Sequence, residues 1–572
     1  MLNYLYPADE RALFTDREYL LGLLEMCRSE LEAGRRKHLA LIGLRRIGKT
    51  LLLKEFLLRL LQRANTSPSV LPLYLDLQRI GLSPEFFALE YVGATLYWFQ
   101  TRGRERPDTH TDPAAQLRLA TTLGKPQTLD ALLQLHQALR EHPIPHHRLL
   151  EQAFAFPEIL ATETGTRFLI ILDEFQEITR LSNYPQVDDV LEIFRAVLQT
   201  QSRVSYIVAG SAISFMERIL HHAQSPLFVH FRSESVGPFT REDTVQLAGK
   251  ILGDRTLPAD ALQTLFTWTS GHPFYVYAVA ERAREMTLLF QREVDDQLLR
   301  EAFVLETLSS TGRIYNLCRY VVEESMAQAR GQTLLRLVLQ LLAQSPAPLT
   351  LTELGRRLKR ASGVTRNLLN RLIEVDLVVQ RNGAFDLRDP VLKVWLAYFH
   401  AGVELLAMPR RELLEHLVTD MSERFQRVSL ELGLARESQV RELMAAFHGQ
   451  RVPGEWFGRS GSFQLPTFHR ITPYQSRDGQ VELDAVASGD ALWVVEIKWK
   501  NQPASRADLE RFLTRVHRVQ ADLPGTPHAC WFIAKAGFKD SALRFGRQKG
   551  ILLSTPDDLQ QLAERLRVRF AK

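Results

Sequence analysis

The sequence predicts an α/β protein whose amino-terminal part is a doubly wound, mainly parallel sheet. Residues 43–50, GLRRIGKT, fit the phosphate-binding loop (P-loop) pattern G-x-x-x-x-G-K-[ST]. A short apolar run at 39–42 precedes this loop, and a segment with helical apolar rhythm at 51–61 follows it. Further apolar runs alternate with helical patterns up to about residue 239, which is typical of a parallel sheet with helices on both faces.

Five short segments are the expected strands of this sheet: 39–42, 70–77, 168–174, 205–211 and 235–239. A polar stretch at 101–147 separates the second from the third and predicts a helical insertion with a flexible start. Because ligands of parallel α/β sheets bind at the carboxyl ends of the strands, a nucleotide is expected at that edge.

The remainder of the chain predicts three further units. Residues 240–326 are helical, with a break at 270–273, and suit a helical lid. Three helices and a hairpin with an Asn-Gly turn then predict a winged helix-turn-helix, from the segments 333–343, 351–360, 364–375 and 377–387. A helix, three strands and a closing helix predict a smaller α/β domain, at 412–434, 480–487, 491–498, 529–534 and from 556.

Length and composition agree with this division. A chain of 572 residues is too long for one core and suggests about three to four domains. The expected boundaries are a P-loop core at 1–240, a lid at 241–330, a winged helix at 331–405 and the last domain at 406–572. The net charge of +5 permits a polyanionic partner. No apolar run approaches the span of a bilayer and no secretory signal opens the chain, which predicts a cytoplasmic protein without membrane contact.

The P-loop specifies how a nucleotide is held. Backbone N–H groups of the turn and of the following helix face an anion, Lys49 reaches the outer phosphates, and the Thr50 hydroxyl ligates Mg²⁺. The pattern fits ATP or GTP, and we take ATP as the cofactor. The expected cofactor-binding residues of the loop are Gly43, Arg45, Arg46, Gly48, Lys49 and Thr50.

An apolar strand ending in Asp173-Glu174 forms a Walker B pattern. Asp173 is expected to hold Mg²⁺ through water, and Glu174 to polarise the attacking water. Phosphoryl transfer depends mostly on positioning and charge neutralisation, so Lys49, Mg²⁺ and an arginine near the γ-phosphate are expected to carry most of the catalysis. An acidic strand-to-loop turn without catalytic function is the alternative.

The chain resembles the archaeal-type ATPases of the STAND and AAA+-related P-loop class over about residues 10–400. The motifs that carry the resemblance are FTDRE at 14–18, the P-loop, LDEFQ at 172–176, AGS at 209–211 and GHP at 271–273. The resemblance implies a sensor-like role for Ser211 and a nucleotide-proximal role for His272 in the lid.

Similar proteins carry a basic residue after a Ser-Pro-Leu segment as a candidate arginine finger. Here the continuation departs from the usual Gly-Arg, and Arg232 is the nearest arginine. The resemblance therefore points to Arg232 for this role, with an ordinary surface arginine as the alternative.

Basic residues are concentrated in the predicted winged helix. A recognition helix can present such residues to DNA phosphates, whereas a solvated helix face or a protein-docking module are the alternatives. The residues concerned are Arg356, Arg357, Lys359, Arg360, Arg366, Arg371 and Arg381.

Near the carboxyl terminus, Asp484, Glu496 and Lys498 match the D…E-x-K arrangement of PD-(D/E)xK nucleases. The two-residue period of a strand puts Glu496 and Lys498 on one face. Asp484 and Glu496 are expected to hold Mg²⁺ or Mn²⁺, and Lys498 to orient or activate the water, with an ordinary polar strand face as the alternative.

The resemblance to the ATPase family favours the nuclease interpretation, because its members often end in a restriction-endonuclease-like domain with these residues. The nuclease fold usually has an upstream helical glutamate, but Gln426 stands at the matching place and a substitute role for Glu423 stays open.

The leading hypothesis is an ATP-dependent switch or motor that controls a DNA-directed, metal-dependent nuclease-like domain. The chain is expected to form a homo-oligomer, with a protein partner at the winged helix as a further option. The alternatives are an ATP-regulated scaffold or a transcriptional regulator, which bind DNA or protein without cleavage.

Overall fold

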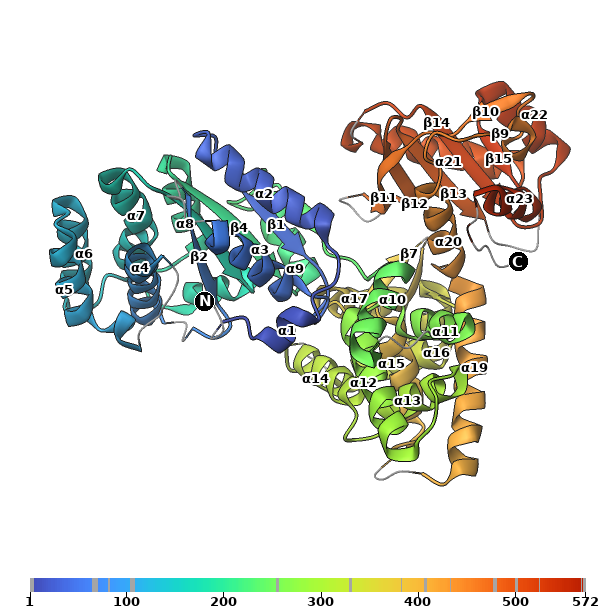
Figure 1. Ribbon diagram of the computed structural model, residues 1–572, viewed down its shortest axis with the longest axis horizontal. Coiled ribbons are helices and arrows are strands. Elements are labelled where there is room, and N and C mark those ends of the chain that lie inside the picture. The colour runs from blue at the N-terminus through green and yellow to red at the C-terminus, as the bar shows by residue number, and fades with distance from the viewer. Residues whose placement is uncertain are drawn as a thin grey trace. The chain divides into compact units, whose positions relative to one another are not determined.

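The computed structural model (Figure 1) describes residues 5–63, 70–80, 83–102, 108–253, 257–328, 332–381, 383–405, 409–432, 434–476, 481–498, 503–523, 525–566 and 568. It divides the chain into two compact units, where the sequence predicts four domains. The first unit comprises Met1–Arg330, Arg371–Leu377 and Gly402–Glu415. The second comprises Gly331–Asn370, Val378–Ala401 and His416–Lys572.

A five-stranded parallel sheet forms the centre of the first unit, which confirms the predicted α/β class. Its strands lie in the order β2-β3-β4-β1-β5. Their bounds are β1 Leu39–Ile42, β2 Val70–Asp76, β3 Arg167–Asp173, β4 Val204–Gly210 and β5 Arg232–Ser235. The position of β4 between β1 and β3 brings the ends of these three strands together at the carboxyl edge.

The prediction of the fifth strand at 235–239 is wrong by about three residues. Ser235 pairs with Ile42, the last residue of β1, and the chain then leaves the sheet through Gly237 and Pro238. Because proline lacks the N–H that a ladder requires, the strand cannot extend through Pro238.

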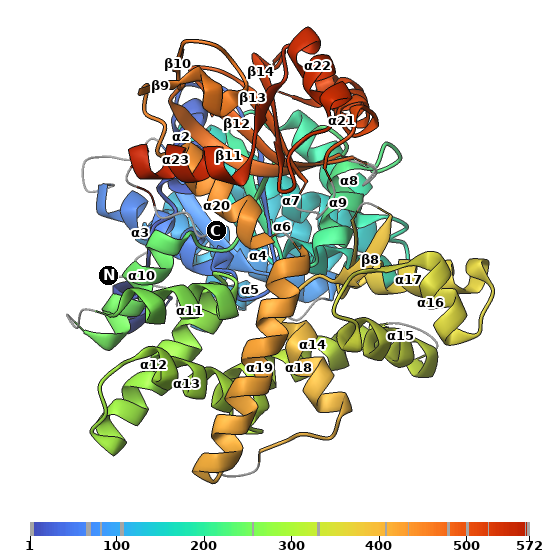
Figure 2. The ribbon, with the colours of Figure 1, turned by 90° about the vertical axis from the view of Figure 1, so that its right-hand side faces the viewer.

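Helices cover both faces of this sheet, as its apolar strands require. Figure 2 shows α2 (Glu18–Glu32) and α3 (Lys49–Arg63) on one side of the sheet, and α7 (His146–Thr164) and α8 (Val190–Thr200) on the other. Tyr206 of β4 lies fully buried on the second side. The Phe194 ring of α8 meets it edge-on at 4.9 Å, and the hydroxyl of Tyr91, from α4 (Pro84–Thr101), lies 3.2 Å from its own.

The predicted helical insertion is present as η2 (Asp108–Thr111), α5 (Pro113–Leu123) and α6 (Pro126–Ala138). Buried polar groups attach it to α4: the His110 Nε2 lies 2.6 Å from Glu90, and the Gln116 amide donates to the carbonyl oxygens of Leu89 and His110. The expected flexible start falls partly on 103–107, outside the described residues.

Among the described residues of the first unit, five helices follow the sheet in the range predicted to be a lid: α10 Arg241–Leu252, α11 Ala259–Thr269, α12 Pro273–Phe290, α13 Asp296–Leu308 and α14 Arg313–Gln328. The predicted break at 270–273 is a left-handed turn, with φ of 52° at Ser270 and 65° at Gly271. A Cβ on Gly271 would meet the Phe239 carbonyl oxygen at 2.4 Å, so the turn requires glycine.

The second unit contains the predicted helix-turn-helix. Its described helices are α15 Gln332–Gln344, α16 Leu351–Leu358, α17 Ser362–Glu374 and α18 Pro390–His400, and α17 passes into the first unit at its end. The wing is a sheet in the order β6-β8-β7, from Leu349–Thr350, Ala384–Leu387 and Val378–Arg381. Asn382, half of the predicted Asn-Gly turn, lies outside the described residues.

The carboxyl-terminal part of this unit contains a mixed sheet in the order β11-β12-β13-β14-β15. Its strands are Phe468–Gln475, Glu482–Gly489, Trp493–Lys498, Ala529–Ala534 and Leu552–Ser554. The first three are antiparallel and the last two continue in parallel. The sequence predicts β12 to β14 but misses β11 and β15, and also a two-stranded ribbon of β9 (Arg451–Pro453) and β10 (Ser462–Gln464).

Helices sandwich this sheet. The apolar side chains of α20 (Leu434–Ala445) and α23 (Pro556–Leu566) form one cluster with it, and those of α21 (Arg506–Val519) and α22 (Asp540–Lys549) form another. Figure 2 shows α23 and the pair α21 and α22 on opposite sides of the strands. The long helix α19 (Arg411–Leu432) precedes α20.

None of the helices in the described part of the chain is long and apolar enough to cross a bilayer. The cytoplasmic location stays a prediction.

Candidate functional site

The P-loop connects β1 to α3 and turns sharply. Two of its residues have a positive φ, 59° at Arg46 and 101° at Gly48. Gly43 lies close to the residues that follow β5, and a Cβ on it would meet the Val236 carbonyl oxygen at 2.4 Å. The loop is thus pressed against the sheet, and the helix α3 begins at Lys49 with its N-terminus toward the loop, which is the arrangement that binds a phosphate.

Lys49 lies under this loop and is only 4% exposed. Its Nζ donates to the carbonyl oxygens of Gly43 at 2.8 Å and Leu44 at 2.9 Å. Burial lowers the pKa of this ammonium, while the carboxylates of Glu174 and Asp173 oppose that shift. The positive charge is therefore held at the base of the loop beside the Walker B carboxylates.

The two predicted magnesium ligands, Thr50 and Asp173, come together in the structure, and Tyr74 joins them. The Thr50 hydroxyl donates to Asp173 Oδ2 at 2.7 Å, and the Tyr74 hydroxyl donates to the same oxygen at 3.0 Å. Burial, with the nearby charges of Glu174 and Asp76, raises the pKa of Asp173 to about 6. A buried hydroxyl and carboxylate in a negative environment suit a hard divalent cation, so Thr50 and Asp173 fit the predicted Mg²⁺.

Glu174 and Ser211 meet across two neighbouring strand ends. The Ser211 hydroxyl donates to Glu174 Oε2 at 2.6 Å, and the Gln176 amide donates to the same oxygen at 2.6 Å. Because β4 lies next to β3, the residue after β4 reaches the carboxylate after β3. Ser211 thus contacts the residue that is predicted to polarise water, and Gln176 is a second contact that sequence analysis missed.

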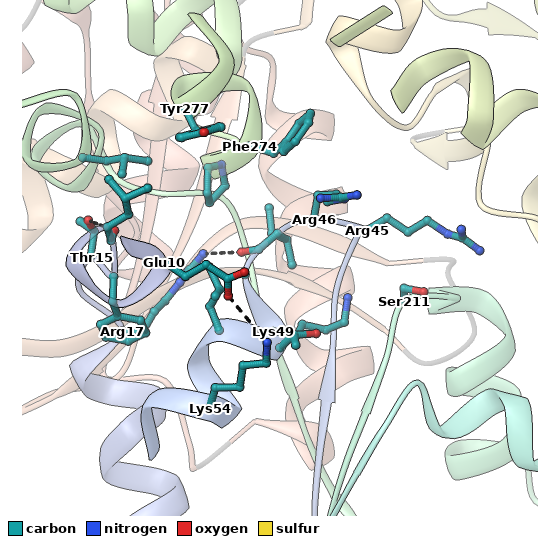
Figure 3. A pocket seen from close by; sticks show the side chains of 18 of the residues that line it. Glu10, Thr15, Arg17, Arg45, Arg46, Lys49, Lys54, Ser211, Phe274 and Tyr277 are labelled. Atoms are coloured by element: carbon teal, nitrogen blue, oxygen red, sulfur yellow. Dashed lines mark hydrogen bonds and ion pairs between the residues drawn. The ribbon is translucent and has the colours of Figure 1, made fainter. Parts of the chain in front are cut away.

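The lid contacts the P-loop through its GHP motif. The His272 Nε2 lies 3.2 Å from the Arg45 carbonyl oxygen, and His272 is 5% exposed. The Arg46 guanidinium lies 5.3 Å from the centre of the Phe274 ring, at the start of α12. Figure 3 shows Arg46 and Phe274 on the same side of the pocket, with Arg45 extending away from them.

Arg17, in the FTDRE motif, is a positioning residue to which sequence analysis gave no role. Its guanidinium donates to the carbonyl oxygens of Ile47 at 3.1 Å and Gly237 at 2.8 Å, and lies 4.6 Å from the centre of the Phe239 ring. Burial lowers its pKa to about 10. Arg17 therefore ties the P-loop to the exit of β5 (Figure 3).

These elements enclose a cavity of about 1220 Å³. Its wall includes the P-loop from Arg45 to Thr50 and, on the lid side, Phe274 and Tyr277. A volume of this size accommodates a nucleotide, since pockets for small ligands occupy roughly 300–1,000 Å³. Apolar side chains and a phosphate-binding loop in one wall suit the base and the phosphates of a nucleotide.

Arg232 does not lie at this cavity. The prediction that it acts as an arginine finger is therefore wrong for the nucleotide site of its own chain. Arg232 is the first residue of β5 and pairs with Leu39, the first residue of β1. It thus lies at the amino edge of the sheet, opposite the P-loop. Its guanidinium donates to Glu234 at 2.6 Å.

In the second unit, the basic residues Arg356, Arg357, Lys359 and Arg360 lie exposed at the end of α16. Arg366 of α17 is half-buried: its guanidinium lies 5.4 Å from the centre of the Phe385 ring of the wing. The side chain of Arg381 lies outside the described residues. Of the residues predicted to contact DNA phosphates, Arg356 and Arg357 are thus on α16, Lys359 and Arg360 follow it, and Arg366 and Arg371 are on α17.

The carboxyl-terminal carboxylates lie on neighbouring strands of the mixed sheet. Asp484 Oδ2 accepts the Ile497 N–H at 2.6 Å. Glu496 forms an ion pair with Arg515 of α21, and the Lys498 Nζ lies 2.6 Å from Asp508 of the same helix. Glu496 and Lys498 thus share a face, as predicted.

Both predicted side chains on that face are engaged by α21. Burial opposes ionisation of Asp508, but hydrogen bonds from Lys498, Ser505 and Arg511 outweigh it and hold its pKa well below the usual range. Within the described residues, no group of three or more His, Cys, Asp or Glu side chains is gathered to hold a metal ion. The side chain of Gln426 lies outside the described residues.

Comparisons with known proteins agree with parts of this description. Residues 337–382 match the family of the IclR helix-turn-helix domain, which confirms the predicted helix-turn-helix. No curated protein matches the chain by sequence.

Several solved structures resemble the chain in outline. A Walker-type ATPase of Pyrococcus abyssi is 15% identical, with 68% of this chain and 97% of that chain covered and a TM-score of 0.47. The ORC2 protein of Aeropyrum pernix is 13% identical (73% and 99% covered, TM-score 0.42), and ORC1 of that organism, in complex with DNA, is 16% identical (70% and 97% covered, TM-score 0.37). At these values, conclusions about function rest on the site itself.

We predict that Gly43→Ala displaces the P-loop, because the added methyl group would lie 2.4 Å from the Val236 carbonyl oxygen. Isothermal titration with ATP and Mg²⁺ should show at least about a tenfold loss of affinity, which corresponds to about 1.4 kcal/mol. Gly22→Ala in α2 is the matched control, since a Cβ there meets nothing within 4 Å. Equal ATP affinity in the two variants would contradict the prediction.

Proposed function

We propose that this protein is a Mg²⁺-dependent ATPase whose nucleotide state acts on a DNA-binding helix-turn-helix. The observation that carries the proposal is the meeting of Lys49, Thr50, Asp173, Glu174 and Ser211 at the carboxyl edge of one parallel sheet. Thr50 and Asp173 lie 123 positions apart in the sequence, and Glu174 and Ser211 lie 37 positions apart. The order of the strands brings them together.

The roles of the residues follow from their contacts. The N–H groups of the P-loop and the first turn of α3 bind the phosphates, and Lys49 neutralises their charge. Thr50 and Asp173 would hold Mg²⁺, which when bound neutralises charge that develops on the phosphoryl oxygens. Glu174 is placed to orient the attacking water, and its hydrogen bond from Ser211 fixes the position of its carboxylate.

The base of the bound ATP is expected beside apolar side chains of the cavity wall. His272 and Arg17 hold the lid turn and the β5 exit against the P-loop, so both contribute to the site by positioning it.

The ATPase proposal predicts that binding and hydrolysis are separable. Lys49→Met should abolish ATP binding, because it removes the buried charge at the base of the loop. Glu174→Gln should retain binding and lower the hydrolysis rate by about 10²-fold or more, as is usual for loss of a positioned general base. Calorimetry and phosphate release measure the two effects. Unimpaired ATP hydrolysis in both variants would contradict the assignment of this cavity as the ATPase site.

For DNA binding, α17 is proposed as the recognition helix. Asn367 and Asn370 lie exposed on it, and asparagine amides are suited to the edge of adenine. The exposed basic residues at the end of α16 are placed to bind phosphates, which position the protein but do not read the sequence.

We predict that Arg357→Ala weakens binding to all DNA sequences alike and lowers the slope of log K against log salt by about 1, as loss of one phosphate contact requires. Fluorescence anisotropy of a labelled duplex at several salt concentrations measures this slope. Arg411→Ala is the control, since Arg411 is an exposed arginine of α19 that pairs with Glu415. The same slope in wild type and Arg357→Ala would show that Arg357 does not bind a DNA phosphate.

A second candidate activity is metal-dependent DNA cleavage by the carboxyl-terminal sheet, under control of the ATPase. It is supported by Asp484 and Glu496 on adjacent strands with Lys498 on the same side. Two carboxylates bind Mg²⁺ or Mn²⁺ only when waters and substrate oxygens complete the shell. The ion pairs of Glu496 with Arg515 and of Lys498 with Asp508 favour the opposite function, binding of DNA or protein without cleavage.

An assay with plasmid, linear and branched DNA and a panel of divalent metals distinguishes these two functions. If the domain is a nuclease, Asp484→Asn should abolish cleavage while Asp490→Asn, in the loop between β12 and β13, leaves it intact. Intact DNA under every condition, with DNA binding retained, would show a domain that binds and does not cut. A homo-oligomer and a protein partner at the winged helix stay predictions.

A further inference from the structure

The end of the proposed recognition helix is held by two elements that border the nucleotide site. Residues 371–377, the end of α17 and the turn after it, belong to the first unit together with α9 (Ile213–His221) and α14. Every contact described below lies within that unit. These contacts can affect DNA binding because α17 is one continuous helix from Ser362 to Glu374.

The first element is the start of α9, three residues after the sensor-like Ser211. The Ser214 N–H donates to Asp376 Oδ1 at 3.0 Å. The Ser214 hydroxyl lies 2.7 Å from the same oxygen and 2.9 Å from the Ile373 carbonyl oxygen. A carboxylate at a helix N-terminus is stabilised by the exposed N–H groups there, so Asp376 binds α9 as a cap contributed from outside the helix.

The second element is α14, which reaches the P-loop. The Ser325 hydroxyl donates to the Val375 carbonyl oxygen at 3.4 Å. The preceding residue, Glu324, accepts two hydrogen bonds from the Arg45 guanidinium, one of them 2.8 Å long, and the Tyr320 hydroxyl accepts another at 3.0 Å. Neighbouring residues of α14 thus hold the P-loop arginine and the turn after α17.

Arg45 and Ser211 both line the cavity, where a bound nucleotide can act on them. Arg45 lines the cavity, so the phosphates of a bound nucleotide compete with Glu324 for its guanidinium. Ser211 donates to Glu174, the residue placed to orient the attacking water. Two independent paths therefore lead from the phosphates to residues 373–376.

We propose that this cluster, Ser214, Ser325, Glu324 and Asp376, is a nucleotide-controlled clasp that restrains the end of α17. With Arg45 on Glu324, the clasp is closed and α17 is held at its carboxyl end. A bound triphosphate draws Arg45 toward the phosphates and loosens the clasp, and α17 is then free to adjust to a DNA groove. The inference rests on the proposed ATPase and DNA-binding functions and adds the link between them.

Such a link is a coupling free energy, and it is reciprocal. The nucleotide should raise the affinity for DNA, and DNA should raise the affinity for the nucleotide by the same factor. Coupling between two sites of one protein is usually about 5- to 150-fold, so we expect at least about a fivefold effect in the wild-type protein.

Two substitutions open the clasp from its two sides. Asp376→Gly removes the cap of α9, and glycine tolerates the φ of 61° at this position without strain. Glu324→Gln removes the charge that holds Arg45. Each should raise the DNA affinity of the nucleotide-free protein toward the nucleotide-bound value, so that the ratio of the two affinities falls toward one.

Matched controls separate the clasp from general damage to the fold. Gln186→Gly also places glycine at a positive φ, 65°, at an exposed site of the first unit. Glu323→Gln changes the neighbouring glutamate of α14, which is exposed and pairs with Arg319. Both controls should keep the wild-type ratio, and thermal melting should show all four variants folded.

The experiment measures DNA binding by anisotropy for the full chain, with and without a non-hydrolysable ATP analogue and Mg²⁺, and nucleotide binding by calorimetry. If both ligands bind but the wild-type affinities are independent, the clasp is refuted while the proposed function stands. A coupling that persists unchanged in Asp376→Gly and Glu324→Gln also refutes it. If the wild-type protein binds no nucleotide, or no DNA, the proposed function itself fails, and calorimetry and anisotropy each report that separately.

Discussion

The candidate site depends on one constraint, the position of β4 between β1 and β3 in the parallel sheet. Parallel strands end at the same edge, so this order sets the P-loop, the Walker B carboxylates and the sensor-like serine side by side. The hydrogen bond from Ser211 to Glu174 joins the ends of the neighbouring strands β4 and β3, and the one from Thr50 to Asp173 joins the ends of β1 and β3 across β4. A different strand order would leave the same motifs in the sequence without a common site.

The geometry concentrates charge at this edge. Asp173, Glu174 and Asp76 bring negative charge close together, and burial raises the pKa of Asp173 to about 6. The buried ammonium of Lys49 offsets part of that charge. This arrangement suits the binding of a divalent cation together with a polyanion. The cation reduces the repulsion between the carboxylates and the polyanion, and the polyanion reduces the repulsion between the cation and Lys49.

Sequence predicts the parts of the site that local patterns encode. One short motif contains Gly43, Gly48, Lys49 and Thr50. The apolar strands that end in Asp173 and Gly210 predict the carboxyl edge of the sheet. The pairing of Arg17 with Ile47 and Gly237 could not be predicted, because it joins segments up to 220 positions apart through backbone oxygens, which leave no trace in the residue types. Arg232 shows the converse: proximity to a motif in sequence placed it near the nucleotide, whereas strand pairing puts it at the other edge.

The same distinction explains the carboxyl-terminal domain. The alternation around Glu496 and Lys498 predicts that they share a face, and they do. The partners on that face come from α21, whose Asp508 and Arg515 carry no motif of their own. Each partner has the charge opposite to the side chain it meets, so α21 neutralises the face without a metal ion. A metal cation has to compete with Arg515 for Glu496, and a DNA phosphate has to compete with Asp508 for Lys498. The outcome of this competition decides whether the face binds DNA, cleaves DNA or only packs against α21.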